Sequence, residues 1–290
     1  MKEKGKTIIH LSRPSTLITN MPFVKKIFDN YLRNNPFRLK LTHLRHKLRN
    51  ISKGSPLDLF YTILIETNPV CNRKCSYCPN AKNPRKGKLM SEEIFYKIID
   101  ELSEINFKGK ICPHFFGEPL LDKRLPKLLK YAKDKLPNVR IVIYTNGDLL
   151  TIDLFKELVK LGVNIIEVTE HDEKVSENMK IIFNFLDKNP IYKKHLNYRR
   201  NLYIDERAGL VKSGFEKRAR KICTTASYNM TINYKGDIIL CCNDYFGKYK
   251  FGNVANEKLI DIWNKKGYKK IRQNNMDGKF SLDICKNCKE

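Results

Sequence analysis

The chain has 290 residues and a formal net charge of +25, with 56 Lys or Arg against 31 Asp or Glu. A chain of this length can bury a substantial core without disulfide bridges. The chain has nine cysteines, but its N-terminus contains no apolar signal segment. We therefore expect a protein of the reducing cytosol and not a secreted protein with a disulfide framework. No stretch approaches the roughly 20 consecutive apolar residues that a membrane-spanning helix needs. The positive charge permits attraction to nucleic acid, anionic lipid or a phosphorylated small molecule, but lysines spread over solvated helix faces explain it equally well.

Residues 1–58 are predicted to be a basic N-terminal extension that Pro14, Pro22 and Pro36 interrupt. Within it, Leu41, Leu44 and Leu48 are spaced for one apolar stripe of a helix, and basic residues surround that stripe. Such a helix could lie on a membrane surface or contact the phosphates of a nucleic acid. We expect it instead to dock on the domain that follows.

Residues 59–207 alternate between strand and helix patterns. Helices are expected at 91–105, with Ser91 as the N-cap, and at 125–135, 154–161 and 177–186. Strands are expected at 61–66, before and up to 116, and at 139–144, 164–169 and 202–205. Strands alternating with helices predict an α/β fold with a parallel sheet, whose functional residues follow the carboxyl ends of the strands. About five to six strands make a partial, shortened barrel of the TIM type.

Residues 208–290 change to short strands and turns. The segments 228–233 and 238–242 flank the turn Tyr234-Lys235-Gly236-Asp237 and predict a β-hairpin, which a helix at 259–270 follows. The sequence therefore predicts a small, cysteine-rich C-terminal domain.

Three cysteines gather in the loop after the first predicted strand. Cys71, Cys75 and Cys78 have the spacing C-x3-C-x2-C. Three thiolates in one loop can hold three irons of a 4Fe-4S cluster and leave the fourth iron open, and an open metal position is typical of a catalytic site. The alternative is a zinc knuckle, which needs a fourth ligand nearby; His114, the next histidine along the chain, lies in a different loop.

This cysteine spacing after a strand, with the aromatic Tyr77 before the third cysteine, resembles the signature of the radical S-adenosylmethionine enzymes. The resemblance implies that the open iron binds S-adenosylmethionine. It also implies that an external donor such as flavodoxin or ferredoxin reduces the cluster. The cofactor is then cleaved to methionine and a 5'-deoxyadenosyl radical, which abstracts a hydrogen atom from the substrate.

Further segments at strand ends are similar to motifs of the same family. Gly117-Glu118-Pro119, preceded by Phe116 in place of a first glycine, looks like the Gly-Gly-Glu-Pro motif that binds the methionine amino group. Thr145-Asn146 looks like the Thr-Asn-Gly segment near the ribose and carboxylate of the cofactor. The fourth strand ends in four polar residues that would face the same opening, and we expect cofactor or substrate contacts from among them: Glu167, Thr169, Glu170 and His171.

A second set of cysteines lies in the C-terminal domain and comprises Cys223, Cys241, Cys285 and Cys288. Four thiolates can close a metal site completely, and their spacing alone fits structural zinc as well as a 4Fe-4S cluster. The arrangement resembles the twitch domain, the shortened form of the SPASM domain, which implies an auxiliary 4Fe-4S cluster.

Two cysteines remain outside these sets. Cys112 falls within the second predicted strand, where a thiol packs as a small apolar side chain. Cys242 should point away from its neighbour Cys241, because side chains alternate along a strand. The family resemblance gives it a second possible role, as a hydrogen-atom donor like the cysteine of radical epimerases.

The resemblance covers residues 60–290 and extends to twitch-type dehydrogenases with a similarly shortened barrel. It implies that a hydroxylated, sugar-like or cyclitol-like small molecule is oxidised while the auxiliary cluster accepts an electron. Arg207 matches the place of a substrate-contacting arginine in those enzymes, and a surface ion pair with Glu206 is the alternative. Radical epimerisation and peptide modification remain alternative reactions, and a basic zinc protein that binds RNA is the alternative outside enzymes.

Overall fold

The computed structural model describes residues 36–52, 58–171, 175–200, 206–211 and 220–289. The chain divides into two compact units between Thr42 and His43, and both sets of cysteines belong to the second unit. The predicted boundary between barrel and C-terminal domain, at 207/208, falls inside this unit and stays a prediction.

The second unit is built on one sheet of eight strands in the order β5-β4-β3-β2-β1-β6-β7-β8. The six neighbouring strands from β5 to β6 in this order run parallel to one another. β7 pairs antiparallel with β6, and β8 pairs antiparallel with β7. The strands are β1 (Thr62–Ile65), β2 (Lys110–Cys112), β3 (Arg140–Thr145), β4 (Ile165–Thr169), β5 (Leu196–Arg199), β6 (Asn229–Ile232), β7 (Asp237–Ile239) and β8 (Lys250–Asn253). The expected partial barrel of five to six parallel strands is therefore confirmed.

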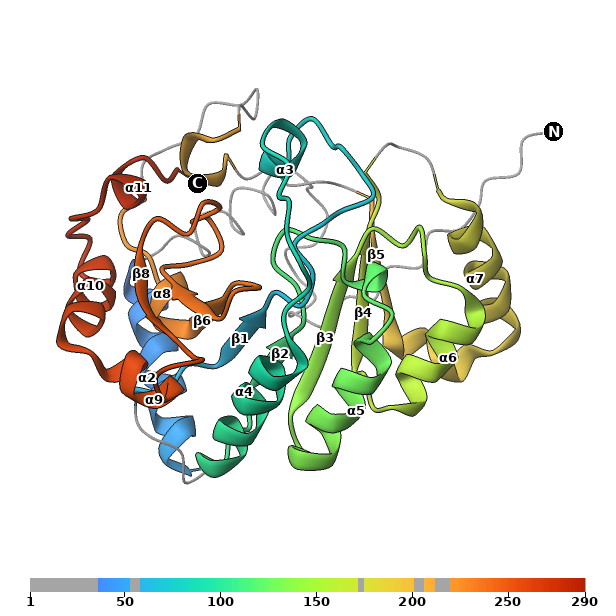
Figure 1. Ribbon diagram of the computed structural model, residues 1–290, viewed down its shortest axis with the longest axis horizontal. Helices are drawn as coiled ribbons and strands as arrows, with labels where there is room; N and C mark the ends of the chain where they lie inside the picture. The colour runs from blue at the N-terminus through green and yellow to red at the C-terminus, as the bar shows by residue number, and fades with distance from the viewer. Residues whose placement is uncertain (1–35, 53–57, 172–174, 201–205, 212–219, 290) are drawn as a thin grey trace, which may run out of the picture. The chain divides into compact units, whose positions relative to one another are not determined.

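The C-terminal hairpin continues this sheet, because β6 pairs in parallel with β1. The register sets Thr62 opposite Asn229 and Ile65 opposite Ile232. Figure 1 shows the orange C-terminal strands beside the blue β1. The hairpin β6–β7, expected at 228–242, is thus joined to the first strand of the sheet, a pairing that the sequence pattern did not predict.

The helices follow the strands as expected and cover the sheet with apolar faces. In α4, Phe95, Ile98, Ile99 and Leu102 are buried at helical spacing, and the side chain of Ser91 caps the helix by accepting from the backbone N–H of Ile94. The main helices are α4 (Glu92–Glu104), α5 (Leu125–Lys135), α6 (Ile152–Lys160), α7 (Glu177–Lys188), α9 (Leu259–Asn264) and α10 (Lys266–Met276). The short ones are α3 (Pro79–Lys82), α8 (Thr225–Tyr228), α11 (Asp283–Lys286), and the 3-10 turns η1 (Pro119–Leu121), η2 (Pro190–His195) and η3 (Arg207–Gly209).

The helix α2 (Pro36–Ser52) forms where the leucine stripe predicted a helix, but the leucines of the stripe are exposed. Leu44 is 52% and Leu48 57% exposed. His46 and Asn50 are buried instead, and both ring and amide nitrogens reach the carbonyl oxygen of Leu59, at 2.8 and 3.0 Å. From His43 onward the helix therefore contacts the domain that follows, as expected, but through its polar face and not through the leucine stripe.

Three further boundaries differ from expectation. The second strand ends at Cys112, so the residues up to 116 form a loop. The fifth strand is Leu196–Arg199, and the segment 202–205, where it was expected, lies outside the described residues. The single helix expected at 259–270 is divided at Lys265, whose ψ of 131° interrupts the helical backbone between α9 and α10.

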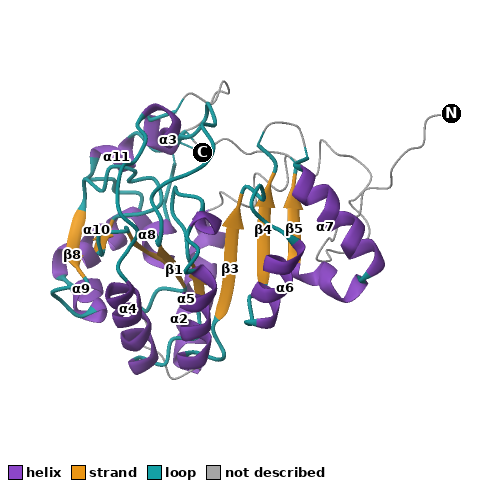
Figure 2. Cartoon of the chain, turned by 45° about the vertical axis from the view of Figure 1, so that its right-hand side comes forward, coloured by secondary structure: helices purple, strands orange, loops and turns teal. Residues whose placement is uncertain are grey.

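The carboxyl ends of the parallel strands lie at one edge of the sheet. In Figure 2 the arrowheads of β3, β4 and β5 point toward the edge where α3 lies. The chain leaves β1 at this edge into the loop with Cys71, Cys75 and Cys78, and α3 begins directly after Cys78. Among the described residues, no helix is long and apolar enough to cross a membrane.

The central strand β1 gives a test of this core. Ile63 is 0% exposed, and replacing it with Ala should lower the free energy of unfolding by about 2–4 kcal/mol, because a cavity is left between sheet and helices. Ile181, 52% exposed on α7, is the matched control, whose replacement should cost no more than about 0.5 kcal/mol. Urea denaturation followed by circular dichroism measures both; equal losses would contradict the placement of β1 in the core.

Candidate functional site

The three cysteines of the first set share one loop at the carboxyl end of β1. Each is half-buried, the backbone N–H of Cys78 donates to the carbonyl oxygen of Cys75, and the backbone N–H of Arg73 donates to the Cys71 sulfur at 3.4 Å. Burial is the main cause that raises the pKa of Cys71, and the charges of Cys75 and Cys78 add to it. Thiols grouped in this way resist ionisation unless a cation offsets their charges, which a bound iron cluster does.

Asp148 joins the cysteine loop to the loop after β3. Its carboxylate accepts hydrogen bonds from Asn72, at 3.0 Å, and from the guanidinium of Arg73, which also forms an ion pair with it. The hydrogen bond from Arg73 is the main reason that the pKa of Asp148 is lowered. Asn146 adds a bond from its amide to Asn72 at 2.8 Å. The two predicted binding loops are therefore held together by Asn146, which belongs to a predicted motif, and by Asp148, Asn72 and Arg73, which had no predicted role.

Gly117 is required by close packing. A Cβ atom at this position would lie 1.9 Å from the carbonyl oxygen of Asn68, so no side chain fits. The same approach lets the backbone N–H of Glu118 donate to Val70 at 2.9 Å and lets the Asn68 amide donate to the carbonyl oxygen of Glu118. The Gly-Glu-Pro segment thus packs directly on the backbone that leads into the cysteine loop.

The carboxylate of Glu118 is 3% exposed and ties the strand ends together. It accepts from the Thr145 hydroxyl at 2.6 Å, from the Asn146 backbone N–H at 2.9 Å and from the Leu120 N–H at 3.1 Å. Burial raises its pKa, and these hydrogen bonds act against that rise. A carboxylate has about four acceptor sites, so one remains for a ligand. Pro119 opens the turn η1, where its missing N–H costs nothing.

The residues at the end of β4 contact two different parts of the molecule, the cysteine loop and β5. Tyr77 of the cysteine loop is hydrogen-bonded to His171, and the two rings are stacked. Glu167 and Glu170 instead accept from Asn197 and Tyr198 of β5, at 2.8 and 2.6 Å. Thr169, half-buried, pairs with Arg199 across the strands. His171 is therefore the member of this group that reaches the cysteine loop.

The four cysteines of the second set line one pocket. Cys223 precedes α8, Cys241 follows β7, and the remaining two lie in and after α11, so three segments distant in sequence meet there. Burial raises the pKa of Cys241 well above its usual value and that of Cys285 to about 11, and the neighbouring thiols contribute to both shifts. Cys242 does not line this pocket, and Cys112 is buried within β2.

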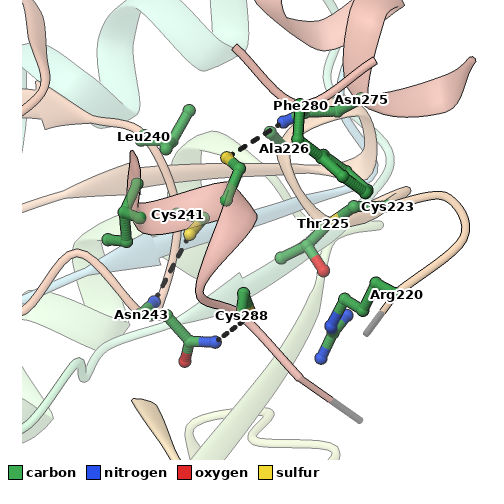
Figure 3. A pocket seen from close by; sticks show the side chains of 12 residues that line it. Arg220, Cys223, Thr225, Ala226, Leu240, Cys241, Asn243, Asn275, Phe280 and Cys288 are labelled. Atoms are coloured by element: carbon green, nitrogen blue, oxygen red, sulfur yellow. Dashed lines mark hydrogen bonds between the residues drawn. The ribbon is translucent and has the colours of Figure 1, made fainter. Parts of the chain in front are cut away.

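Two asparagines donate to the sulfur atoms of this pocket. Asn243 donates from its backbone N–H to Cys241 at 3.4 Å and from its side-chain amide to Cys288 at 3.3 Å, as the dashed lines in Figure 3 show. Asn275 donates to Cys285 at 3.6 Å. Amide donors of this kind stabilise thiolates and tune the reduction potential of an iron-sulfur cluster that the thiolates bind. The residues present therefore fit a cluster.

No three Cys, His, Asp or Glu side chains among the described residues converge closely enough to hold a single metal ion. A 4Fe-4S cluster does not need such convergence, because each thiolate binds its own iron.

Arg207 lies between Phe116 and Asn243. Its guanidinium is 5.3 Å from the ring centroid of Phe116, and its Nη1 donates to the Oδ1 of Asn243 at 3.3 Å. The backbone of Arg207 and Ala208 is left-handed, with φ of 49° and 54°, which costs energy in residues other than glycine. Strain of this kind is typical of functional positions. Instead of a solvated side chain, the structure gives Arg207 an aromatic ring and an amide that itself contacts Cys288.

The sequence analysis missed a buried ion pair at the centre of this region. Glu66 at the end of β1 is 0% exposed and binds the Arg85 guanidinium at 2.6 Å; it also accepts from the backbone N–H groups of Phe116 and Tyr234. Arg85 contacts the ring and the carbonyl oxygen of Tyr245 as well. A charged residue at the end of an apolar strand was the available signal.

His114 was considered only as a possible zinc ligand. Its ring lies 4.7 Å from that of Tyr144, and its buried Nδ1 has no hydrogen-bond partner among the described residues. Burial lowers the pKa of His114 to about 3, and the charge of Arg207 adds to the shift. The imidazole is therefore neutral near pH 7.

Comparisons with known proteins address both regions. The sequence profile of the Radical SAM superfamily matches residues 65–171, and that of an iron-sulfur cluster-binding domain of the SPASM type matches residues 223–289. The S-adenosyl-L-methionine-dependent 2-deoxy-scyllo-inosamine dehydrogenase of Niallia circulans is 31% identical over 237 residues, which are 79% of this chain and 93% of that protein. The chain belongs to the radical SAM superfamily. Its SPASM-type region fits the expected twitch-like domain.

Other radical SAM relatives match a smaller part. The PqqA peptide cyclase of Granulibacter bethesdensis is 31% identical over 121 residues, 41% of this chain and 31% of that protein. Among solved structures, BtrN in complex with AdoMet and 2-DOIA is similar with a TM-score of 0.74 and 30% identity, covering 79% of this chain and 93% of that chain. BtrN in an open conformation gives 0.64 at 28% identity, with 79% and 92% covered. This radical SAM chain is thus more similar to the ligand-bound arrangement than to the open one.

Membership of this family defines the cofactors. Radical SAM proteins use a 4Fe-4S cluster and S-adenosyl-L-methionine, and the SPASM-type domain adds auxiliary iron-sulfur chemistry. Such an enzyme acts on a small molecule and needs a reductant. The alternative of a basic zinc protein that binds RNA is set aside.

Iron analysis tests the two predicted sets of ligands separately. Replacing Cys75 with Ala should lower the iron content of anaerobically reconstituted protein from about eight to about four per chain, and Cys285→Ala should remove the other half. Cys112→Ala, a buried cysteine outside both sets, is the control and should keep about eight irons. Unchanged iron in the Cys75 variant would contradict the assignment.

Proposed function

We propose that this enzyme dehydrogenates a hydroxylated small molecule of the cyclitol or sugar class. The observation that carries the proposal is the 31% identity to 2-deoxy-scyllo-inosamine dehydrogenase over 93% of that enzyme's length. The position of Arg207 between Phe116 and Asn243 adds to it. As cluster ligands we propose Cys71, Cys75 and Cys78 for the radical-generating cluster, and Cys223, Cys241, Cys285 and Cys288 for the auxiliary one.

When bound, the cofactors would supply two things. One is a radical that removes a hydrogen atom from a carbinol carbon, and the other is an acceptor for the electron that is released as the carbinol becomes a ketone. The chain's own residues orient the reactants. We propose that Glu118, Thr145 and Asn146 form the wall that binds S-adenosylmethionine, because their hydrogen bonds already fix three strand ends against the cysteine loop. Gly117 and Pro119 shape this wall, and Tyr77 with His171 closes its other side.

Arg207 is proposed to hold the substrate. A guanidinium donates several hydrogen bonds in a fixed plane and stays protonated, so it can bind hydroxyl groups without exchanging protons with them. The neutral His114, whose pKa Arg207 helps to lower, offers its Nδ1 atom in the same region, and no residue that the structure describes is a hydrogen-bond partner of this atom. Glu167 and Thr169 remain proposed contacts on the β4 side, where Glu167 is held by Asn197.

Label transfer tests the reaction. Incubation of reconstituted enzyme with 2-deoxy-scyllo-inosamine and with other cyclitols, each deuterated at the carbinol carbons, should place deuterium in 5'-deoxyadenosine and give a ketone. An epimerase using Cys242 would also place deuterium in 5'-deoxyadenosine, but it would return an alcohol in which a solvent-derived hydrogen replaces the label, and no ketone. The absence of label in 5'-deoxyadenosine across the panel would refute dehydrogenation of this substrate class.

Substitution of Arg207 tests its role. Loss of hydrogen bonds from a charged donor costs about 1.5–3 kcal/mol, so Arg207→Lys should lower kcat/KM for the substrate roughly ten- to 150-fold. Cleavage of S-adenosylmethionine in the absence of substrate should stay unchanged. Arg140→Lys, at an exposed position at the start of β3, is the matched control. Equal kinetics of the two variants would remove Arg207 from the substrate site.

The amide of Asn243 gives a prediction that does not depend on turnover. Removing an N–H donor destabilises the more negative, reduced cluster, so Asn243→Leu should shift the auxiliary potential to more negative values. Asn264→Leu, exposed at the end of α9, is the control. Redox titration monitored by electron paramagnetic resonance measures both, and coincident curves would show that Asn243 does not affect the cluster.

A further inference from the structure

A basic groove lies beside the loop of the first cysteine set. It is a hollow of about 560 Å³ between the segment 82–86 and the region of the β6–β7 hairpin and the loop after it. Five of its thirteen lining residues are Lys or Arg and one is acidic, whereas Lys and Arg make up 56 of the 290 residues of the chain. The groove is therefore more basic than the rest of an already basic protein. Its charged members are Lys82, Arg85, Lys86, Lys235, Lys250 and Asp237.

The positive charge at the groove is presented to solvent. Lys82, Lys86 and Lys235 are exposed, and Phe246 beside them is 63% exposed. Asp237 is buried and already binds Lys250 at 2.9 Å, so it does not offset the other lysines. A positively charged surface is complementary to an acidic protein, and exposed aromatic rings are enriched at surfaces that bind proteins.

One layer of side chains separates the groove from the cysteine loop. Tyr245 lines the groove, is 2% exposed and packs against Phe246 with 5.1 Å between ring centroids. Its hydroxyl donates to Asn80 at 3.0 Å, two residues after Cys78. The pKa of Tyr245 is raised mainly by burial, and the charge of Cys78 contributes. A protein seated in the groove therefore approaches the proposed radical-generating cluster through Tyr245 and α3.

We propose that this groove docks the acidic electron-transfer protein that reduces the radical-generating cluster. The inference rests on the proposed function, which requires one electron for each cleavage of S-adenosylmethionine. A flavin hydroquinone in the donor gives up that electron and becomes the semiquinone, while the oxidised cluster is reduced. No atom is transferred. The lysines steer the donor, so the docking step should weaken as salt increases.

Charge reversal in the full, cluster-loaded enzyme tests the proposal. The groove variant is Lys82→Glu/Lys86→Glu/Lys235→Glu. Its matched control, Lys160→Glu/Lys188→Glu/Lys194→Glu, changes three exposed lysines next to the starts of β4 and β5, at the opposite edge of the sheet. Formation of 5'-deoxyadenosine is measured with two reductants: an acidic flavodoxin kept reduced by NADPH and its reductase, and dithionite, which needs no docking surface.

The groove variant should raise the KM for flavodoxin at least tenfold, because the loss of a single ion pair across an interface has an effect of about this size. Its rate with dithionite should stay within twofold of the unmodified enzyme. The control variant should match the unmodified enzyme with both reductants. Increasing NaCl from about 50 to about 200 mM should slow the flavodoxin reaction of the unmodified enzyme and have little effect on the groove variant.

The outcomes separate the two proposals. Equal KM values for flavodoxin in the groove and control variants, with normal dithionite rates, would overturn the docking site and leave the enzyme reaction intact. No 5'-deoxyadenosine with dithionite in the unmodified enzyme would overturn the proposed function itself. If the groove variant loses iron, the milder Lys86→Gln/Lys235→Gln variant replaces it. This variant should raise the KM for flavodoxin at least threefold, and an unchanged KM would count against the site. Binding of RNA or of anionic lipid vesicles that the groove variant loses, with equal KM values for flavodoxin in the groove and control variants, would assign the groove to another partner and likewise overturn the proposal.

Discussion

The parallel pairing of β1 with β6 is the constraint on which the rest of the molecule depends. Four residue pairs, from Thr62 opposite Asn229 to Ile65 opposite Ile232, join the first strand of the barrel to the first strand of the C-terminal hairpin. Because parallel strands end at the same edge, the loop after β1, which carries three cysteines, and the hairpin turn after β6 leave the sheet side by side. The antiparallel strand β7 then runs back along β6, and Cys241 follows it. A sheet that ended at β1 would give the C-terminal cysteines no fixed place relative to the barrel.

Glu66 secures this junction with a charge that the low-dielectric interior makes costly to leave unpaired. Burial raises its pKa, and Arg85 together with the N–H groups of Phe116 and Tyr234 favours the ionised form. One carboxylate thus ties the end of β1, the loop after β2 and the hairpin turn. The aromatic rings of Phe116 and Tyr245, which contact Arg85, continue this cluster toward Arg207 on one side and the basic groove on the other.

Much of the fold could be predicted from the sequence, because apolar periodicity and capping residues act locally. Ser91 marks the start of α4, and 125–135 matches α5. The pairing of β1 with β6 could not be predicted, since no residue pattern in either strand specifies which strand lies beside it. The leucine stripe of α2 did not identify the face by which this helix is attached, for a related reason. Spacing identifies an apolar face, but His46 and Asn50 on a different face reach the carbonyl oxygen of Leu59. Likewise, cysteine spacing indicated the clusters, whereas Asn243 became visible only where three distant segments meet.

The central claim is that one continuous sheet carries the residues of both proposed clusters and brings the two clusters close enough to interact. Electron paramagnetic resonance of the fully reduced enzyme tests this most directly, because two paramagnetic clusters that lie close together broaden and split each other's signals. The spectrum of the unmodified enzyme should differ from the sum of the spectra of the Cys75→Ala and Cys285→Ala variants, each of which retains one cluster. A spectrum equal to that sum would contradict the account, since it would mean that the clusters are too far apart to interact.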